Sequence, residues 1–208
     1  MKETKQNILE ATLRLFNKQG FVNVRLQHIA DEANIRIGNL AYHYPTKKDL
    51  LQKIYERLVQ SQVELLNELS IVPLFENLDR HWDNVFETQN TYAFFYQDTL
   101  EVLRFEPQIA KKYQVHIKWE KDQYQRVLEF NHSRGAIENP GSEDEIKQRS
   151  ELIWLMENSW LQLSLISGKG LSGAGEFKNY MWQSITPYLS SIGRQEYDQL
   201  INFKKIQL

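Results

Sequence analysis

The first fifty residues are divided into short helical segments by residues that end helices. Within each segment, apolar residues recur three or four positions apart, which is the spacing of a helix face. Gly20 and Asn34 tolerate the left-handed backbone that ends a helix, and Pro45 cannot continue one. We therefore expect three short helices at the start of the chain, over residues 5–19, 26–32 and 36–44.

The rest of the chain also shows helical periodicity, with no run of alternating β-branched residues that would indicate a sheet. Thr4 is the expected N-cap of the first helix, and Thr46 and Asp49 form the pattern of a capping box that opens a helix ending near residue 69. Pro187 is expected to kink the penultimate helix, and a short helix is expected last. Further helices are expected over residues 74–89, 92–105, 107–133 and 143–166, and from the Gly-rich loop 167–175 to about residue 192.

Composition and charge narrow the possible functions. The sequence contains no Cys, so disulfides, zinc–thiolate sites and thiol nucleophiles are excluded. It shows neither a signal-peptide core nor an apolar run long enough to span a membrane, so we expect a cytoplasmic protein. Residues 1–58 carry ten Lys/Arg against six Asp/Glu, and the remainder carries an acidic excess. A basic head on an acidic body is typical of a nucleic-acid-binding module joined to a different one.

Two short helices joined by a tight turn, after a supporting helix, form a helix-turn-helix, although a generic three-helix bundle has the same periodicity. The residue types over about 8–51 resemble the N-terminal signature of the TetR family of transcriptional regulators. The resemblance rests on Gly20-Phe21, Leu26-Gln27-His28-Ile29-Ala30, Ala33-Asn34-Ile35, Gly38-Asn39-Leu40, Tyr42-His43-Tyr44 and Lys47-Lys48-Asp49-Leu50-Leu51. It implies an all-α fold, with a helix-turn-helix DNA-binding domain over residues 1–50. A helical-bundle domain for effector binding and dimerisation is implied over residues 51–208.

The third helix of such a head is expected to enter the major groove of DNA. At 100° per residue, Leu40 and Tyr44 face inward, while Asn39, the best candidate to pair with adenine, faces out. The resemblance also implies that Lys47 anchors a backbone phosphate at the start of the fourth helix. The residues expected to contact DNA are Arg25, Gln27, Arg36, Ile37, Gly38, Asn39, Tyr42, His43 and Lys47.

Three positions depart from the family pattern. Arg25 and Arg36 stand where Ser or Thr usually caps the second and third helices, and Ala41 stands where Tyr is usual. We interpret the two arginines as phosphate or guanine contacts, the alternative being surface arginines on weakly capped helices. The phosphate contact missing at Ala41 is assigned to Tyr42. His43 has the alternative role of a packing or capping residue.

The last two long helices resemble the pair through which the family forms an intersubunit four-helix bundle. A regulator that reads a pseudo-palindrome needs two copies, which favours dimerisation over the alternative that these stripes lie in the core of one chain. The expected dimer interface comprises Leu152, Leu155, Ser159, Leu163, Met181, Ile185 and Tyr188.

The middle helices are rich in aromatic residues, and in the family this region encloses an effector cavity. Aromatic walls with a few polar groups suit a small apolar or aromatic molecule, although aromatic stripes at helical spacing also form ordinary cores. The expected ligand-binding residues are Trp82, Phe86, Phe95, Tyr96, His116, Trp119, Trp154 and Asn158.

The sequence therefore predicts a one-component repressor. As a homodimer it would bind a pseudo-palindromic operator and be released by the effector, with activation as a variant. No catalytic residue, cofactor or metal is expected, because the glycines around Lys169 lack phosphate-loop spacing and His116 with Glu120 is interpreted as a surface pair. Two alternatives stay open: a helical-bundle enzyme, and a ligand-independent DNA-binding adaptor regulated by a protein partner.

Overall fold

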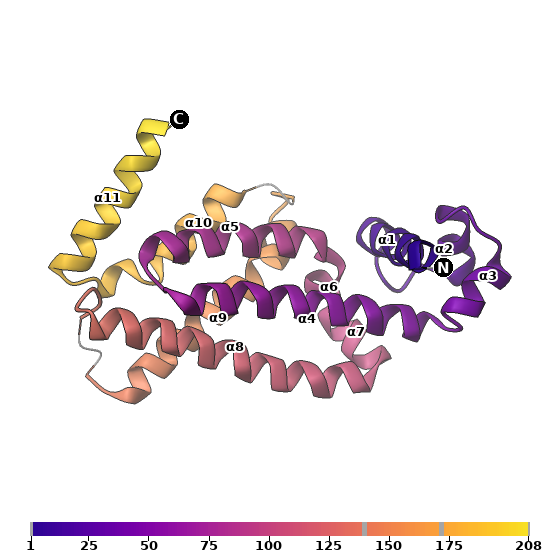
Figure 1. Cartoon of the computed structure of the whole chain (residues 1–208), viewed down its shortest axis with the longest axis horizontal. Coiled ribbons are helices and arrows are strands. Elements are labelled where there is room, and N and C mark those ends of the chain that lie inside the picture. The colour runs from indigo at the N-terminus through magenta and orange to yellow at the C-terminus, as the bar shows by residue number, and fades with distance from the viewer. Residues whose placement is uncertain (1, 139–140, 171–172, 208) are drawn as a thin grey trace. The chain divides into compact units, whose positions relative to one another are not determined.

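The computed structural model describes residues 2–138, 141–170 and 173–207 (Figure 1). These residues form helices and no strand; an isolated bridge joins Ile137 to Leu189. The predicted all-α fold is therefore confirmed. The contacts divide the chain into two compact units. The first unit runs to Ser61 and includes Thr88–Gln114; the second comprises Gln62–Glu87 and the residues from Val115 onward.

The head consists of α1 (Lys2–Gln19), α2 (Leu26–Glu32) and α3 (Ile37–His43), close to the predicted ranges. Gly20 (φ +77°) and Asn34 (φ +54°) adopt the left-handed conformation expected of residues that end helices. The expected cap at Thr4 is wrong, because α1 already begins at Lys2.

Helix α4 (Lys47–Ile71) opens with the predicted capping box. The Asp49 carboxylate accepts the Thr46 backbone N–H (2.8 Å), and the Asp49 N–H donates to the Thr46 hydroxyl (3.2 Å). Buried Leu50, Ile54 and Leu58 then follow along one helix face. Along the chain, α4 starts in the first unit and ends in the second.

The segment predicted as one helix over 92–105 is divided into two after α5 (Phe75–Thr91). Helices α6 (Ala93–Gln97) and α7 (Thr99–Phe105) meet at Asp98, whose backbone (φ −110°, ψ 24°) is not helical. The Asp98 carboxylate accepts the backbone N–H of Phe21 (3.2 Å), a contact with a distant segment that local periodicity does not reveal. Helix α8 spans Pro107–Ser133, as predicted.

The end of the chain differs from the prediction. Helix α9 (Glu143–Ile166) has the predicted bounds, but α10 (Ala174–Gln183) ends well before residue 192. Pro187 lies in the 3-10 turn Thr186–Tyr188 and so does not kink a longer helix. The last helix, α11 (Ser191–Gln207), has 17 residues and is not short. Figure 1 shows it leaving the end of the bundle at which α8 ends.

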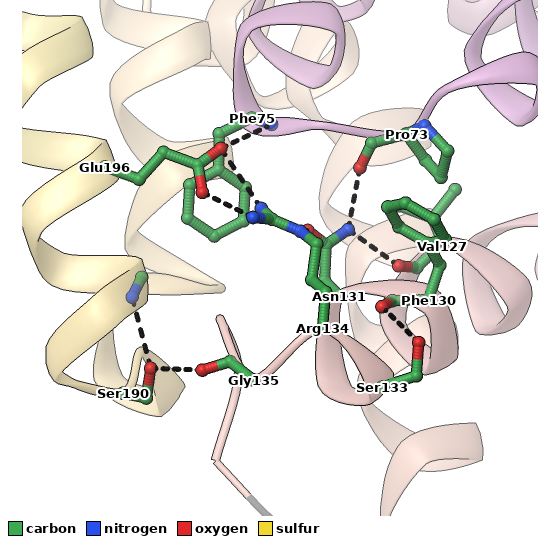
Figure 2. Close-up of polar contacts among 11 residues, drawn as sticks. Pro73, Phe75, Val127, Phe130, Asn131, Ser133, Arg134, Gly135, Ser190 and Glu196 are labelled. Carbon is green, nitrogen blue, oxygen red and sulfur yellow. Dashed lines mark hydrogen bonds and ion pairs between the residues drawn. The ribbon is translucent and has the colours of Figure 1, made fainter.

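The start of α11 is held against the end of α8 and the start of α5 (Figure 2). Arg134 pairs with Glu196 through both of its terminal nitrogens, and its guanidinium lies 4.9 Å from the centre of the Phe75 ring. Gly193 lies so close to the chain that a Cβ there would be 1.9 Å from the Ala136 carbonyl oxygen. The first turns of α11 are therefore an integral part of the second unit.

Candidate DNA-binding surface and regulatory body

Helix α3 has one buried side and one exposed side. Leu40 is fully buried and Tyr44 is nearly so, as the helical spacing predicts. On the other side, Tyr42 is 75% exposed and Ile37 is 41% exposed, and Asn39 is exposed too. A Cβ at Gly38 would meet no atom within 4 Å. The structure thus brings the central residues of the predicted reading face together on open surface.

Arg25 and Arg36 both occupy N-cap positions with extended backbones, and neither side chain caps its helix. Both side chains are exposed. At α2 the ring of His28 partly replaces the missing cap, since its Nδ1 accepts the Arg25 N–H (3.3 Å). The weak capping leaves both guanidinium groups available at the two helix starts. Gln27, also exposed, donates its amide to Asp31 (2.7 Å).

The aromatic pair Tyr42 and His43 lies at the end of α3. Their rings meet edge to face, with centroids 5.1 Å apart. His43 is half-buried whereas Tyr42 projects from the surface. Ala41 beside them is exposed and supplies no hydroxyl group.

Lys47 is placed differently from the other predicted DNA contacts. Its ammonium donates to the backbone carbonyls of Phe21 and of Val22 (3.3 Å for Val22) and lies 4.2 Å from the centre of the Phe21 ring. Burial lowers the pKa of this side chain below its ordinary value. The ammonium therefore faces the turn between α1 and α2 within its own chain.

Polar side chains also tie the head to the helix breaks of the segment Thr88–Gln114. Asn17 donates to the Thr91 carbonyl (2.9 Å) and accepts the Phe94 N–H (3.0 Å) at the break between α5 and α6. Asp98 binds the Phe21 N–H at the next break. At the break before α8 the contact is with α4, since buried Glu106 lies 3.4 Å from the Lys48 ammonium. These ties explain why this segment belongs to the same unit as the head.

The predicted ligand-binding residues divide between the two units. Phe95 and Tyr96 are buried in the first unit, where their rings lie 6.1 Å apart. Trp82 and Phe86 are buried in the second unit, packed against Trp182 and Phe177. The remaining four also lie in the second unit: His116 and Trp154 contact Glu120 directly, Trp119 stacks on His116, and the Asn158 amide donates to the Trp154 carbonyl.

His116 and Glu120 are buried, so their interpretation as a surface pair is wrong. His116 Nε2 lies 3.3 Å from one Glu120 oxygen and 3.0 Å from the Gln62 amide oxygen. Trp154 Nε1 donates to the other Glu120 oxygen (2.9 Å). Helical periodicity alone does not show which side of α8 faces the bundle.

A second buried polar group centres on Glu157, which the sequence did not single out. The Tyr124 hydroxyl donates to the Glu157 carboxylate, and His81 Nε2 lies 3.0 Å from the same hydroxyl oxygen. Burial, reinforced by the charge of Glu120, raises the pKa of Glu157 to about 8. Burial also lowers the pKa of His81 to about 4. The carboxyl is therefore mostly protonated at neutral pH.

A cavity of about 510 Å³ lies between α9 and α10. Its lining includes Leu155, Ser159, Leu163 and Met181 from the predicted dimer interface, and none of the predicted ligand-binding residues. Leu155 and Leu163 are 54% and 57% exposed, and Leu152 is exposed as well. Met181 and Ile185 face the core of their own chain, so they contribute almost no accessible surface. Tyr188 is half-buried.

Family models match most of the chain. The model described as "Bacterial regulatory proteins, tetR family" matches residues 8–54, and the TetR model described as "Bacterial transcriptional repressor" matches residues 54–197. The chain belongs to the TetR family. Since members of this family are DNA-binding transcription factors, it is a transcriptional regulator and not an enzyme.

Individual relatives of this TetR-family chain match the head by sequence and the whole chain by fold. The HTH-type transcriptional regulator AcrR of Shigella flexneri is 40% identical over 55 residues, about a quarter of either protein (26% of each). A TetR-family regulator from Marinobacter aquaeolei has a TM-score of 0.82 at 24% identity, covering 94% of this chain and 96% of its own. A transcriptional regulator from Saccharomonospora viridis, solved in complex with choline, has a TM-score of 0.72 at 18% identity, covering 91% and 100%.

Two classes of site have no candidate in the part of this TetR-family chain that the structure describes. Among those residues, no three His, Cys, Asp or Glu side chains are grouped so that they could hold a metal ion. None of the described helices combines the length and the apolar character that crossing a membrane requires.

Proposed function

We propose that the chain is a repressor that binds an inverted-repeat operator as a homodimer, with α3 in the major groove. The single observation that carries this proposal is the two-sided character of α3. Leu40 fixes the helix to the head while Ile37, Gly38 and Asn39 face outward. The major groove admits one helix, and the absence of a side chain at Gly38 allows close approach to the duplex.

The exposed side chains divide into base contacts and phosphate contacts. The Asn39 amide suits bidentate pairing with adenine, and the apolar Ile37 suits a thymine methyl group. Arg25 and Arg36 lie at helix starts and suit phosphate or guanine, while Tyr42 and His43 suit phosphate oxygens. Gln27 is the weakest of these contacts, because its amide already donates to Asp31.

Dimerisation through α9 and α10 is supported by the apolar surface there. Leu152, Leu155 and Leu163 are exposed large apolar residues on α9, and Leu155 and Leu163 line the cavity. Exposed apolar patches rimmed by polar residues mark interaction sites. Two copies related by a two-fold axis would cover this surface and present two heads to successive half-sites.

A small-molecule effector is proposed to bind in the second unit near the group around Glu120. Trp119 and Trp154 supply aromatic surface, and Asn158 and His116 supply polar groups. The choline complex of the Saccharomonospora viridis protein supports a small ligand in a neighbour of the same fold. Release of DNA requires that the effector bind the two head arrangements with different affinity. No observation favours regulation by a protein partner.

Selection of bound DNA by the purified protein, followed by a salt titration, tests the proposal. We expect an inverted repeat, and an affinity that falls steeply as salt rises. Arg36→Ala should flatten the slope of log K against log salt by about 0.9, while Asn39→Ala should relax preference at one base pair. Random selected sequences, or a protein that stays monomeric in light scattering with or without DNA, would contradict the proposal.

Leu155→Glu with Leu163→Glu tests the interface in the same assays. We expect a monomer with weak operator binding, because two charges replace exposed apolar surface at the proposed seam. Val115→Glu, at a more exposed apolar position on α8, is the control and should remain dimeric. A dimer that persists in the double variant would place the interface elsewhere.

A further inference from the structure

Three buried polar side chains of the second unit form a chain of hydrogen bonds across three helices. The Tyr124 hydroxyl of α8 lies between the Glu157 carboxyl of α9 and the His81 ring of α5. Its oxygen is 3.0 Å from His81 Nε2 and within hydrogen-bond distance of one Glu157 oxygen. The three residues are between 1% and 6% exposed, so a proton on Glu157 has no direct access to solvent.

The far side of the His81 ring reaches a small cleft between α4 and α5. The cleft has a volume of about 10 Å³, which is room for about one water molecule. His81 and Leu65 line it, together with the exposed side chains of Glu68 and Arg80. Because Nε2 is turned toward Tyr124, the Leu65 carbonyl that acts on this ring lies on the Nδ1 side. The end of the chain next to the cleft is therefore Nδ1, a buried atom with no hydrogen bond of ordinary geometry in the described part of the protein.

The hydrogen bonds of this chain have two consistent arrangements, because a hydroxyl both donates and accepts and a neutral imidazole carries its hydrogen on either nitrogen. When Glu157 is ionised, Tyr124 donates to it and His81 Nε2 donates to Tyr124, which leaves Nδ1 as an acceptor at the cleft. When Glu157 is protonated, both bonds reverse and the hydrogen of the ring moves to Nδ1. The Leu65 carbonyl is placed to accept that hydrogen.

We propose that His81 and Tyr124 form a proton relay between the buried Glu157 carboxyl and solvent at the cleft between α4 and α5. In uptake, hydronium gives a proton to His81 Nδ1 and becomes water, the hydrogen on Nε2 moves to the Tyr124 oxygen, and the Tyr124 hydrogen moves to Glu157. One proton enters and one reaches the carboxyl, so neither His81 nor Tyr124 is left charged. Release runs in the opposite sense. A change of pH thus reverses the hydrogen bonds that join α5, α8 and α9.

Two further titratable groups lie close to Glu157 on α8. Glu120 acts on Glu157 through its charge, and His116 faces Glu120 (3.3 Å). Burial first, and then the charge of Glu120, raise the pKa of Glu157 to about 8, although the Tyr124 hydrogen bond opposes them. The carboxyl therefore exchanges its proton in mildly alkaline solution.

The solvent end of the relay suits proton transfer without storing a charge. Burial lowers the pKa of His81 to about 4, so the ring passes a proton on and does not keep it as imidazolium. At the mouth of the cleft, the Glu68 carboxylate of α4 and the Arg80 guanidinium of α5 lie 3.9 Å apart. Their opposite charges offset each other, so the cleft favours neither form of the ring.

Nitrogen-15 NMR of the imidazole rings tests the relay in the wild-type protein, because the shift of each ring nitrogen shows whether it carries a hydrogen. The His81 signals are those lost in His81→Gln. We expect a neutral ring with its hydrogen on Nδ1 at about pH 6.5 and on Nε2 at about pH 9.5, on either side of the pKa of Glu157. A hydrogen on the same nitrogen at both pH values, or imidazolium at the lower one, would overturn the proposal.

Infrared spectroscopy after a rapid rise in pH measures the rate of release. The band of the protonated Glu157 carboxyl is identified by its loss in Glu157→Gln, and the final pH is one at which the band disappears fully in each protein. We expect Tyr124→Phe and His81→Phe to slow its disappearance about a hundredfold, the factor that a positioned acid–base group contributes to proton transfer. His132→Phe is the control, since this half-buried histidine of α8 binds the Ile137 carbonyl, and it should keep the wild-type rate.

An unchanged rate in both relay variants would show that the proton reaches Glu157 by another route and would overturn the proposal. A wild-type protein without a protonated-carboxyl band at about pH 6.5 would do the same. Circular dichroism establishes that each variant is folded, and if the Phe variants do not fold, the NMR experiment on the wild-type protein decides alone. Both measurements use the free protein, so a failure to find an operator leaves this test intact.

Discussion

The two units of this regulator hold several of their polar side chains differently. In the first unit, Asn17 and Asp98 bind backbone groups at helix breaks, and Glu106 lies beside the Lys48 cation. In the second, Glu120 is held by a histidine and an indole, and Glu157 is bonded to a tyrosine hydroxyl. The first arrangement satisfies each group on folding. The second retains carboxyl groups in a costly environment.

From this difference we expect the first unit to keep a fixed shape and the second unit to respond to protons or ligands. Side-chain contacts at three successive breaks hold the first unit together, and two of them reach the head, whose contact with DNA requires a set shape. Titratable groups with strongly shifted pKa values gather at functional sites more often than elsewhere. We therefore expect a change of proton or ligand to alter the energy of the chain mainly through the second unit.

The largest effect is expected from removing the main aromatic contact of the second unit. Trp82 is fully buried against Trp182, so Trp82→Ala should lower the free energy of unfolding by about 3–5 kcal/mol. Urea unfolding followed by circular dichroism measures this. Phe130→Ala, at a partly exposed aromatic on α8, is the control and should cost about 1 kcal/mol or less. If both variants lost the same free energy of unfolding, the aromatic core would not be the main source of stability in this unit.

The next effect concerns pH. The pKa of Glu157 is raised to about 8, so its contribution to stability is complete below its unfolded value and is lost as the pH rises through 8. The pKa of His81 is lowered to about 4, so its contribution is present above 6.5 and is lost as the pH falls. Between pH 6.5 and 8, stability should therefore fall by roughly 2 kcal/mol through Glu157.

Glu157→Gln sharpens that test. The amide cannot ionise, so the free energy of unfolding should become nearly flat between pH 6.5 and 8. Glu151→Gln changes an exposed carboxylate on the same helix and should keep the wild-type decline. A wild-type protein equally stable at both pH values would show that Glu157 ionises without cost.

A smaller effect is expected at the ties of the first unit. Asn17→Ala leaves the Thr91 carbonyl and the Phe94 N–H without this side-chain partner, which should cost about 1–2 kcal/mol. Operator affinity should fall as well, because the head loses one support. Asn23→Ala removes a similar bond, to Gln19, within the head and should leave affinity nearly unchanged. If the two variants bound the operator with identical affinity, the Asn17 contacts would have no role in DNA binding.

The smallest effect is expected at the surface. Arg104 and Glu101 form an exposed pair one turn apart on α7 (2.7 Å). Arg104→Ala should change the free energy of unfolding by no more than about 0.5 kcal/mol, as for other exposed ion pairs. A change above 1 kcal/mol in thermal or urea unfolding would show that surface charge also holds the first unit together.

The sequence was sufficient to predict elements whose ends are locally encoded. Pro107 opens α8, Ser142 caps α9, and the capping box at Thr46 opens α4, each within a few residues of its effect. The reading face of α3 follows from the same periodicity, because Leu40 marks the buried side.

The features that could not be predicted depend on contacts between distant segments. The break at Asp98 depends on a backbone N–H 77 positions earlier in the sequence. The direction of the Lys47 side chain depends on where the Phe21 and Val22 carbonyls lie. Glu157 is buried because α9 packs against α8. In the sequence, this residue cannot be distinguished from an ordinary surface glutamate.

Gly193, near the start of the last helix, packs directly against the backbone of Ala136, with no room for a side chain between them. A single added carbon atom would stand 1.9 Å from a carbonyl oxygen, whereas ordinary contact begins near 3.4 Å. Any larger residue must therefore push the first turn of α11 outward by more than an ångström and strain the Arg134–Glu196 pair beside it. Any side chain at this position would therefore displace the start of the terminal helix from the backbone that follows α8.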